Sequence, residues 1–86
     1  MWKEILIKVL DGVEDIPSPF AKGAKLEHIF VTVDETTRIG FLWIWCPVTH
    51  RGIDVSRMKI PEDRNSVPAE EFGKLELPKI SFEPIT

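Results

Sequence analysis

The chain has 86 residues, of which 43% are hydrophobic and 29% are charged, and its net charge is −3. A single domain of this length buries only about 60–65% of the surface that its unfolded chain exposes, so the core is thin. The negative net charge argues against wholesale nucleic-acid binding. The single cysteine excludes an intrachain disulfide and fits a reducing compartment. No apolar run approaches the about 20 residues that a membrane-spanning helix needs.

Apolar residues recur at helical spacing near the N-terminus, at Trp2, Ile5, Leu6, Val9, Leu10 and Val13. This stripe predicts an amphipathic helix over residues 2–13, with Gly12 as a glycine near its C-terminal end. Residues 5–10 are also compatible with a strand, because isoleucine and valine favour strands. Residues 14–24 contain two prolines and a glycine, which predict an irregular connection.

Three β-branched and aromatic segments predict strands over residues 26–33, 38–46 and 53–60. The first two form an antiparallel hairpin, and the third alternates only partly, as an edge strand does. Pro68 predicts one helical turn directly after it. Residues 74–85 contain two prolines and are expected in an extended segment at a sheet edge or on a partner.

These elements predict a single α+β domain over residues 1–86. We expect one N-terminal helix packed on an antiparallel β-meander of about three or four strands.

The central strand is apolar on both faces. Its aromatic row consists of Phe41, Trp43 and Trp45, and its aliphatic row consists of Leu42, Ile44 and Cys46. A strand buried on one face only alternates apolar and polar residues, and a chain this short has few residues left to cover a second face. Either the aromatic row lies under the helix and the aliphatic row is exposed, or the aromatic row is exposed. Both arrangements predict a protein partner or a second copy of the chain.

The four arginines lie within residues 38–64, at Arg38, Arg51, Arg57 and Arg64. Five cations there face three acids, so this window carries a charge of +2. Arginines interleaved with aromatic residues are typical of oligonucleotide-binding surfaces, which makes a small nucleic-acid-binding module the alternative function. The same charges also fit an ordinary solvated face.

Cys46 and His50 have the spacing of half a metal site, and the segment resembles a zinc knuckle in which Thr49 replaces the second cysteine. As a catalytic pair they need an orienting third group, for which Asp54 is the nearby candidate. A cysteine at a strand end among apolar neighbours is expected to have a raised pKa and to be inert. We therefore expect no enzyme activity, no cofactor and no metal.

Acidic residues cluster after the predicted helix, at Asp11, Glu14 and Asp15. A small acidic protein can imitate phosphates, although acidic runs are more often solvated loops.

The sequence thus favours a small non-enzymatic protein-interaction domain, of the accessory or inhibitor type that phages encode. We expect it in the cytoplasm, or in the host cytoplasm if the gene is viral. The expected interface residues are Phe41, Trp43 and Trp45, with Arg51 and Arg57 at the rim.

Overall fold

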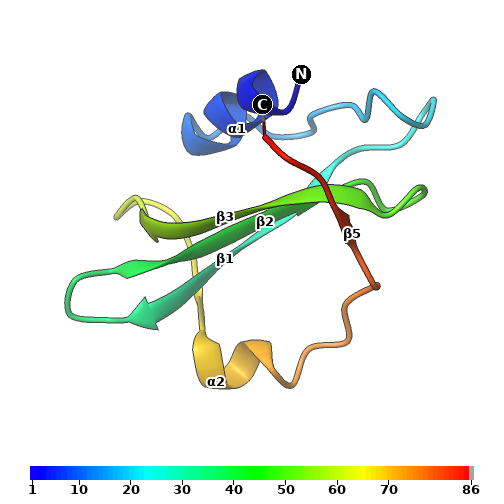
Figure 1. The fold of residues 1–86 in the computed structure, drawn as a ribbon. Coiled ribbons are helices and arrows are strands. Elements are labelled where there is room, and N and C mark those ends of the chain that lie inside the picture. The colour runs from blue at the N-terminus through cyan, green and yellow to red at the C-terminus, as the bar shows by residue number, and fades with distance from the viewer. Residues whose placement is uncertain (86) are drawn as a thin grey trace.

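The structure is a computed structural model that describes residues 1–85. These residues form three layers (Figure 1). A nine-residue helix, α1 (Trp2–Leu10), lies on one side of a five-stranded sheet, and a short helix, α2 (Ala69–Phe72), lies on the other. The strands are β1 (Glu27–Asp34), β2 (Ile39–Trp45), β3 (Arg51–Lys59), β4 (Val67–Pro68) and β5 (Ser81–Phe82). Their order in the sheet is β4-β1-β2-β3-β5.

The α+β class, the N-terminal helix and the central antiparallel strands are confirmed, but the sheet is mixed and not a simple meander. β1, β2 and β3 are antiparallel, whereas β4 is parallel to β1 and β5 is parallel to β3. Parallel neighbours require a connection that crosses the sheet. The chain supplies it after β3 by passing to the far edge at β4, and residues 73–80 then return to the β3 edge (Figure 1).

Helix α1 ends at Leu10, three residues before the predicted end. The Nη2 atom of Arg64 donates a hydrogen bond to the Leu10 carbonyl at 3.0 Å and so satisfies a free group at the helix end. Gly12 has φ +82°, and a Cβ atom there would lie 2.4 Å from the same Nη2. The chain turns where the arginine docks, and glycine adopts this positive φ without strain.

The aliphatic row of β2 lies under α1. The buried core on this face consists of Trp2, Ile5, Val9, Ile16, Phe30, Leu42, Ile44, Ile53 and Ile60. Leu42 and Ile44 are 0% exposed. Each such side chain contributes about 1.5–3 kcal/mol when it leaves water, so this face is the main source of stability. The predicted placement of the aromatic row under the helix is therefore wrong, since α1 covers the aliphatic row.

The aromatic row is covered by the chain's own C-terminal segment. Trp43 packs edge-on against Phe72 of α2 and Phe82 of β5, each with ring centroids 4.9 Å away. Trp45 is 4% exposed, and Phe41 is half-buried. Large aromatic side chains cover much area per residue, which is why a short segment suffices. The expectation that this chain is too short to cover both faces is wrong, and residues 81–82 lie on its own sheet.

Candidate functional site

The predicted interface residues Phe41, Trp43 and Trp45 do share one face. Phe72 packs against Phe41 and Trp43, and Phe82 packs against Trp43. The indole N–H groups of Trp43 and Trp45 are buried without a hydrogen-bond partner among residues 1–85. These observations place the aromatic row in a second core. Its role as an interface stays a prediction.

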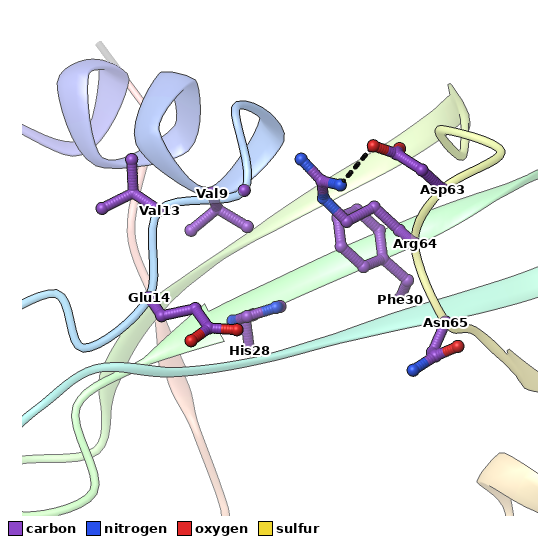
Figure 2. A pocket seen from close by; sticks show the side chains of 9 residues that line it. Val9, Val13, Glu14, His28, Phe30, Asp63, Arg64 and Asn65 are labelled. Carbon is purple, nitrogen blue, oxygen red and sulfur yellow. Dashed lines mark ion pairs between the residues drawn. The ribbon is translucent and has the colours of Figure 1, made fainter.

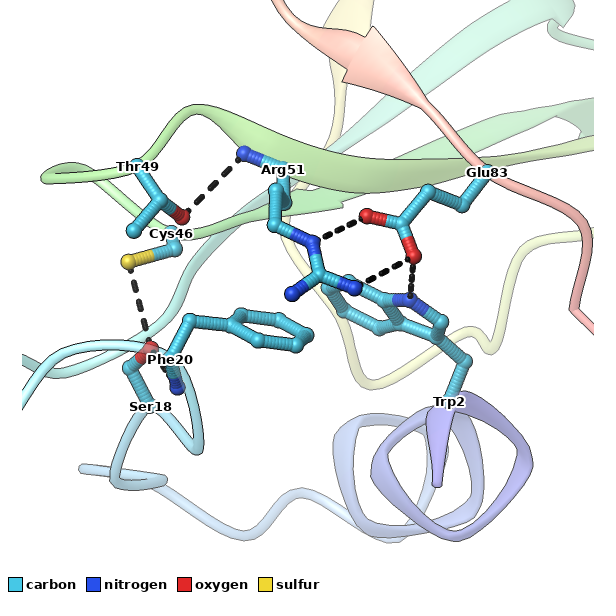
Figure 3. A network of polar contacts seen from close by, with 7 residues as sticks. All are labelled: Trp2, Ser18, Phe20, Cys46, Thr49, Arg51 and Glu83. Carbon is cyan, nitrogen blue, oxygen red and sulfur yellow. Dashed lines mark hydrogen bonds and ion pairs between the residues drawn. The ribbon is translucent and has the colours of Figure 1, made fainter.

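Arg51 is part of a network that ties the C-terminal segment to α1 (Figure 3). Its guanidinium binds the Glu83 carboxylate through two nitrogens and lies 3.9 Å from the centroid of the Phe20 ring. Glu83 also accepts a hydrogen bond from the Trp2 indole at 3.3 Å. The hydrogen bond from Arg51 is the main reason that the pKa of Glu83 is lowered, and partial burial opposes it. The Arg51 side chain therefore already has partners within the chain.

Two other arginines also bind within the chain. Arg38 donates hydrogen bonds to backbone carbonyls in residues 60–64. Arg64 caps α1 and pairs with Asp63 at 2.7 Å. Arg57 is exposed, has φ +54° at a β-bulge, and forms no ion pair with any described residue. Three of the four arginines of the basic window thus bind groups of the same chain, whereas Arg57 and Lys59 form no ion pair with a described residue.

Cys46 directly follows β2, and its sulfur accepts a hydrogen bond from the Ser18 hydroxyl at 3.1 Å (Figure 3). Burial raises the pKa of the thiol, but the Ser18 hydroxyl and the nearby polar groups of Thr49 and Val48 outweigh it and lower the pKa to about 7. The expected raised pKa is therefore wrong. The residue is 0% exposed, and the His50 N–H donates to the Cys46 carbonyl at 2.9 Å, but the His50 imidazole is not among the hydrogen-bond partners of the sulfur in the described chain. Within residues 1–85, no three potential ligands are grouped around a metal position.

The outer side of β1 is covered by the chain over only a short length. β4 pairs with it only at Val31 and Thr32. A Cβ atom on Gly40 of β2 would lie 1.9 Å from the Val31 carbonyl oxygen, so that carbonyl points toward β2. Successive peptide groups of a strand point to opposite sides. The backbone groups of His28, Phe30 and Thr32 therefore point outward, away from β2.

The uncovered stretch lies between two short contacts. The Leu26 N–H donates to the Ile16 carbonyl at 2.8 Å, and Thr32 lies opposite β4. Between them, the N–H and C=O of His28 and the N–H of Phe30 have no strand opposite them in the described chain. We call these outward groups the open edge. Unpaired backbone groups at a sheet edge are a template for another strand.

Three hollows lie along the open edge, and His28 lines all of them. The largest has a volume of about 290 Å³ and lies between the end of α1, β1 and residues 63–65 (Figure 2). We call it the α1 cavity. Val9, Val13 and Phe30 supply its apolar walls. A second hollow of about 250 Å³ continues beside the backbone of β1 toward β4. The edge is therefore recessed, with space for backbone and for at least one side chain.

The α1 cavity is lined by acids that outnumber its cations. Glu14 and Asp63 lie in its wall, and the Asp63 carboxylate pairs with Arg64. Partial burial of the ring, and then the nearby Arg64 guanidinium, lower the pKa of His28, so the imidazole is neutral at pH 7. Glu14 has no ion-pair partner among the described residues. The cavity therefore has a net negative charge.

Sequence reasoning did not identify this site. The acidic cluster that contains Glu14 is visible in the sequence, but its pattern predicts a phosphate mimic or a solvated loop. The site depends on β4 stopping after two residues, and a two-residue strand leaves no periodic signal in the sequence.

Comparisons with known proteins give no assignment. No family model matches the chain, no curated protein matches it, and no solved structure matches its fold. Among the described residues, no helix is both long and apolar enough to cross a membrane.

Proposed function

We propose that this protein is a non-enzymatic interaction domain that binds an extended segment of another protein, in the cytoplasm, by adding it as a strand to β1. The observation that carries the proposal is the open edge at His28 and Phe30, together with the hollows beside it. In strand addition, main-chain hydrogen bonds supply affinity, and pockets for alternate side chains supply specificity.

The open edge is a better docking surface than the aromatic row. Phe41 and Trp43 already pack against the C-terminal segment, so a partner would have to displace Phe72 and Phe82. The backbone groups of the open edge need no such displacement. The aromatic row then stabilises the sheet on the face opposite α1 and keeps β1 in place.

A different protein fits this edge better than a second copy of the chain. Glu14 and Glu27 both lie along the hollows, and neither pairs with a cation in the described chain. Two copies joined edge to edge would bring these like charges together, which opposes association.

Nucleic acid is the weaker alternative. Arg38, Arg51 and Arg64 are engaged by carbonyls or carboxylates of the same chain. Arg57 alone would supply few of the phosphate contacts on which such binding depends.

The test is a selection of binders from a library of displayed extended peptides, followed by two variants at one position. His28→Pro removes the outward N–H from the edge, where proline is tolerated. His28→Ala keeps the N–H and removes only the side chain. Selected peptides should slow exchange of the His28 and Phe30 amide protons, bind His28→Ala well, and lose binding to His28→Pro.

Two results would overturn the proposal. One is that selected peptides protect neither amide proton, and the other is that they bind His28→Pro as tightly as the wild type. Circular dichroism of both variants shows whether the fold is retained. If His28→Pro does not fold, amide protection in the wild type alone decides the question.

A further inference from the structure

We infer that the partner segment carries a lysine or arginine, whose side chain enters the α1 cavity. This rests on the proposed function, because it concerns the chemistry of a strand bound at the same edge.

The geometry places one side chain of an added strand in this cavity. Phe30 belongs to the core beneath α1, so the side chains of His28 and Phe30 point to the α1 side of the sheet. Alternate side chains of a strand laid beside β1 point the same way. The α1 cavity lies next to His28 and Phe30 on that side, so a residue opposite the open edge projects into it (Figure 2).

The charges in the cavity favour a cation. Glu14 is unpaired in the described chain, His28 is neutral, and the Arg64 charge is balanced by Asp63. The C-terminal end of α1 also faces the cavity, and its partial negative charge favours cations. Arg64 itself is a precedent, since its guanidinium already binds the Leu10 carbonyl at that end.

The shape of the cavity also fits a long basic side chain. Val9, Val13 and Phe30 provide apolar surface for the aliphatic stem, while Glu14 can receive the charged end. Lysine and arginine commonly bury their stems in this way and keep the charge near polar groups. The volume of about 290 Å³ is at the lower limit for small-molecule pockets, which suits a single side chain.

The closing experiment uses peptides selected for binding to the wild-type protein. The position over the α1 cavity should be enriched in lysine and arginine. In the best binder, replacing that residue by norleucine should weaken binding about fivefold, and replacing it by glutamate should weaken it further. Glu14→Gln should weaken the lysine peptide about threefold and leave the norleucine peptide unchanged. Glu35→Gln, in the turn after β1, is the control and should change neither.

The outcomes separate the two proposals. If peptides protect the His28 and Phe30 amides but show no basic enrichment, or if Glu14→Gln weakens lysine and norleucine peptides equally, the cation inference is wrong and strand addition stands. If no selected peptide protects those amides, strand addition itself is wrong.

Discussion

The two edges of the sheet are covered by the same C-terminal third of the chain, but to different extents. At the β3 edge, the Ser81 and Glu83 amides donate to the carbonyls of His50 and Gly52, each at 2.8 Å, and the carboxylate of Glu83 binds Arg51. At the β1 edge, β4 ends at Pro68, which has no N–H to donate, and the chain turns away into α2. The β3 edge is therefore sealed at its start, at Arg51 and Gly52, whereas residues 53–59 of β3 and the stretch from His28 to Phe30 of β1 have no strand opposite their outer sides in the described chain.

The largest expected effect comes from breaking the sealed edge at Gly52. A Cβ atom there would lie 2.4 Å from the Ile44 carbonyl oxygen and 2.9 Å from the Ile80 side chain. Gly52→Ala should lower the free energy of unfolding by about 3 kcal/mol, because the backbone cannot yield easily. Urea denaturation measures the change.

Gly73→Ala is the matched control. Gly73 has φ −64°, and its added Cβ would have no neighbour closer than 4.0 Å. It should leave stability unchanged or raise it by about 0.5 kcal/mol. Equal losses in the two variants would show that β5 does not pack closely on β3.

A second comparison concerns the two aromatic residues that cover Trp43, one from each side. Phe72 lies in α2, directly after the strand β4 at the β1 edge, and Phe82 lies in β5 at the β3 edge. Phe72→Ala should cost about 2 kcal/mol, since the ring also contacts Phe41, and Phe82→Ala about 1 kcal/mol, since this residue is 44% exposed. Thermal unfolding and tryptophan fluorescence report both changes. The reverse order would mean that β5, and not α2, is the main cover of the aromatic row.

Polar contacts at the two edges should give smaller effects. The Thr32 hydroxyl donates to Ser66 at 2.7 Å and holds β4 on β1, and Thr32 is 5% exposed. Thr32→Val should cost about 1 kcal/mol by leaving the serine hydroxyl without this donor. Glu83→Gln should cost only about 0.5 kcal/mol, because its pair with Arg51 is partly solvated. High salt should reduce the loss of stability in Glu83→Gln and leave the loss in Thr32→Val unchanged. A salt-dependent loss in Thr32→Val would contradict the interpretation of its contact as a hydrogen bond between neutral groups.

Local signals in the sequence predicted most of the elements. The apolar stripe placed α1, the β-branched segments placed β1 to β3, and Pro68 placed α2 directly after it. The early end of α1 was missed because Arg64, 54 residues away, caps it. The sequence did not predict that Phe72 and Phe82 cover the aromatic row. Each is a single aromatic residue in a largely irregular segment, where no hydrophobic periodicity indicates which residues are buried. The open edge depends on where such a segment stops, which only tertiary structure decides.

The smallest expected effects at pH 7 come from two titratable groups, which also make the stability of the protein depend on pH. Cys46, in the turn before β3, has a pKa lowered from 9.0 to about 7, and His28, on the open edge, has a pKa lowered from 6.5. The folded state therefore holds fewer protons than the unfolded state at both groups, and its stability should rise with pH. The cysteine contribution is complete above pH 9.0 and is lost as the pH falls through about 7. The histidine contribution is complete above pH 6.5 and is lost below it. Urea denaturation at a series of pH values measures both contributions. Cys46→Ala should remove the rise in the free energy of unfolding between about pH 7 and 9.0 and leave the rise near pH 6.5 unchanged. His28→Ala should remove only the rise near pH 6.5. A Cys46→Ala curve that still rises between pH 7 and 9 would mean that the hydrogen bonds to the sulfur do not favour the thiolate.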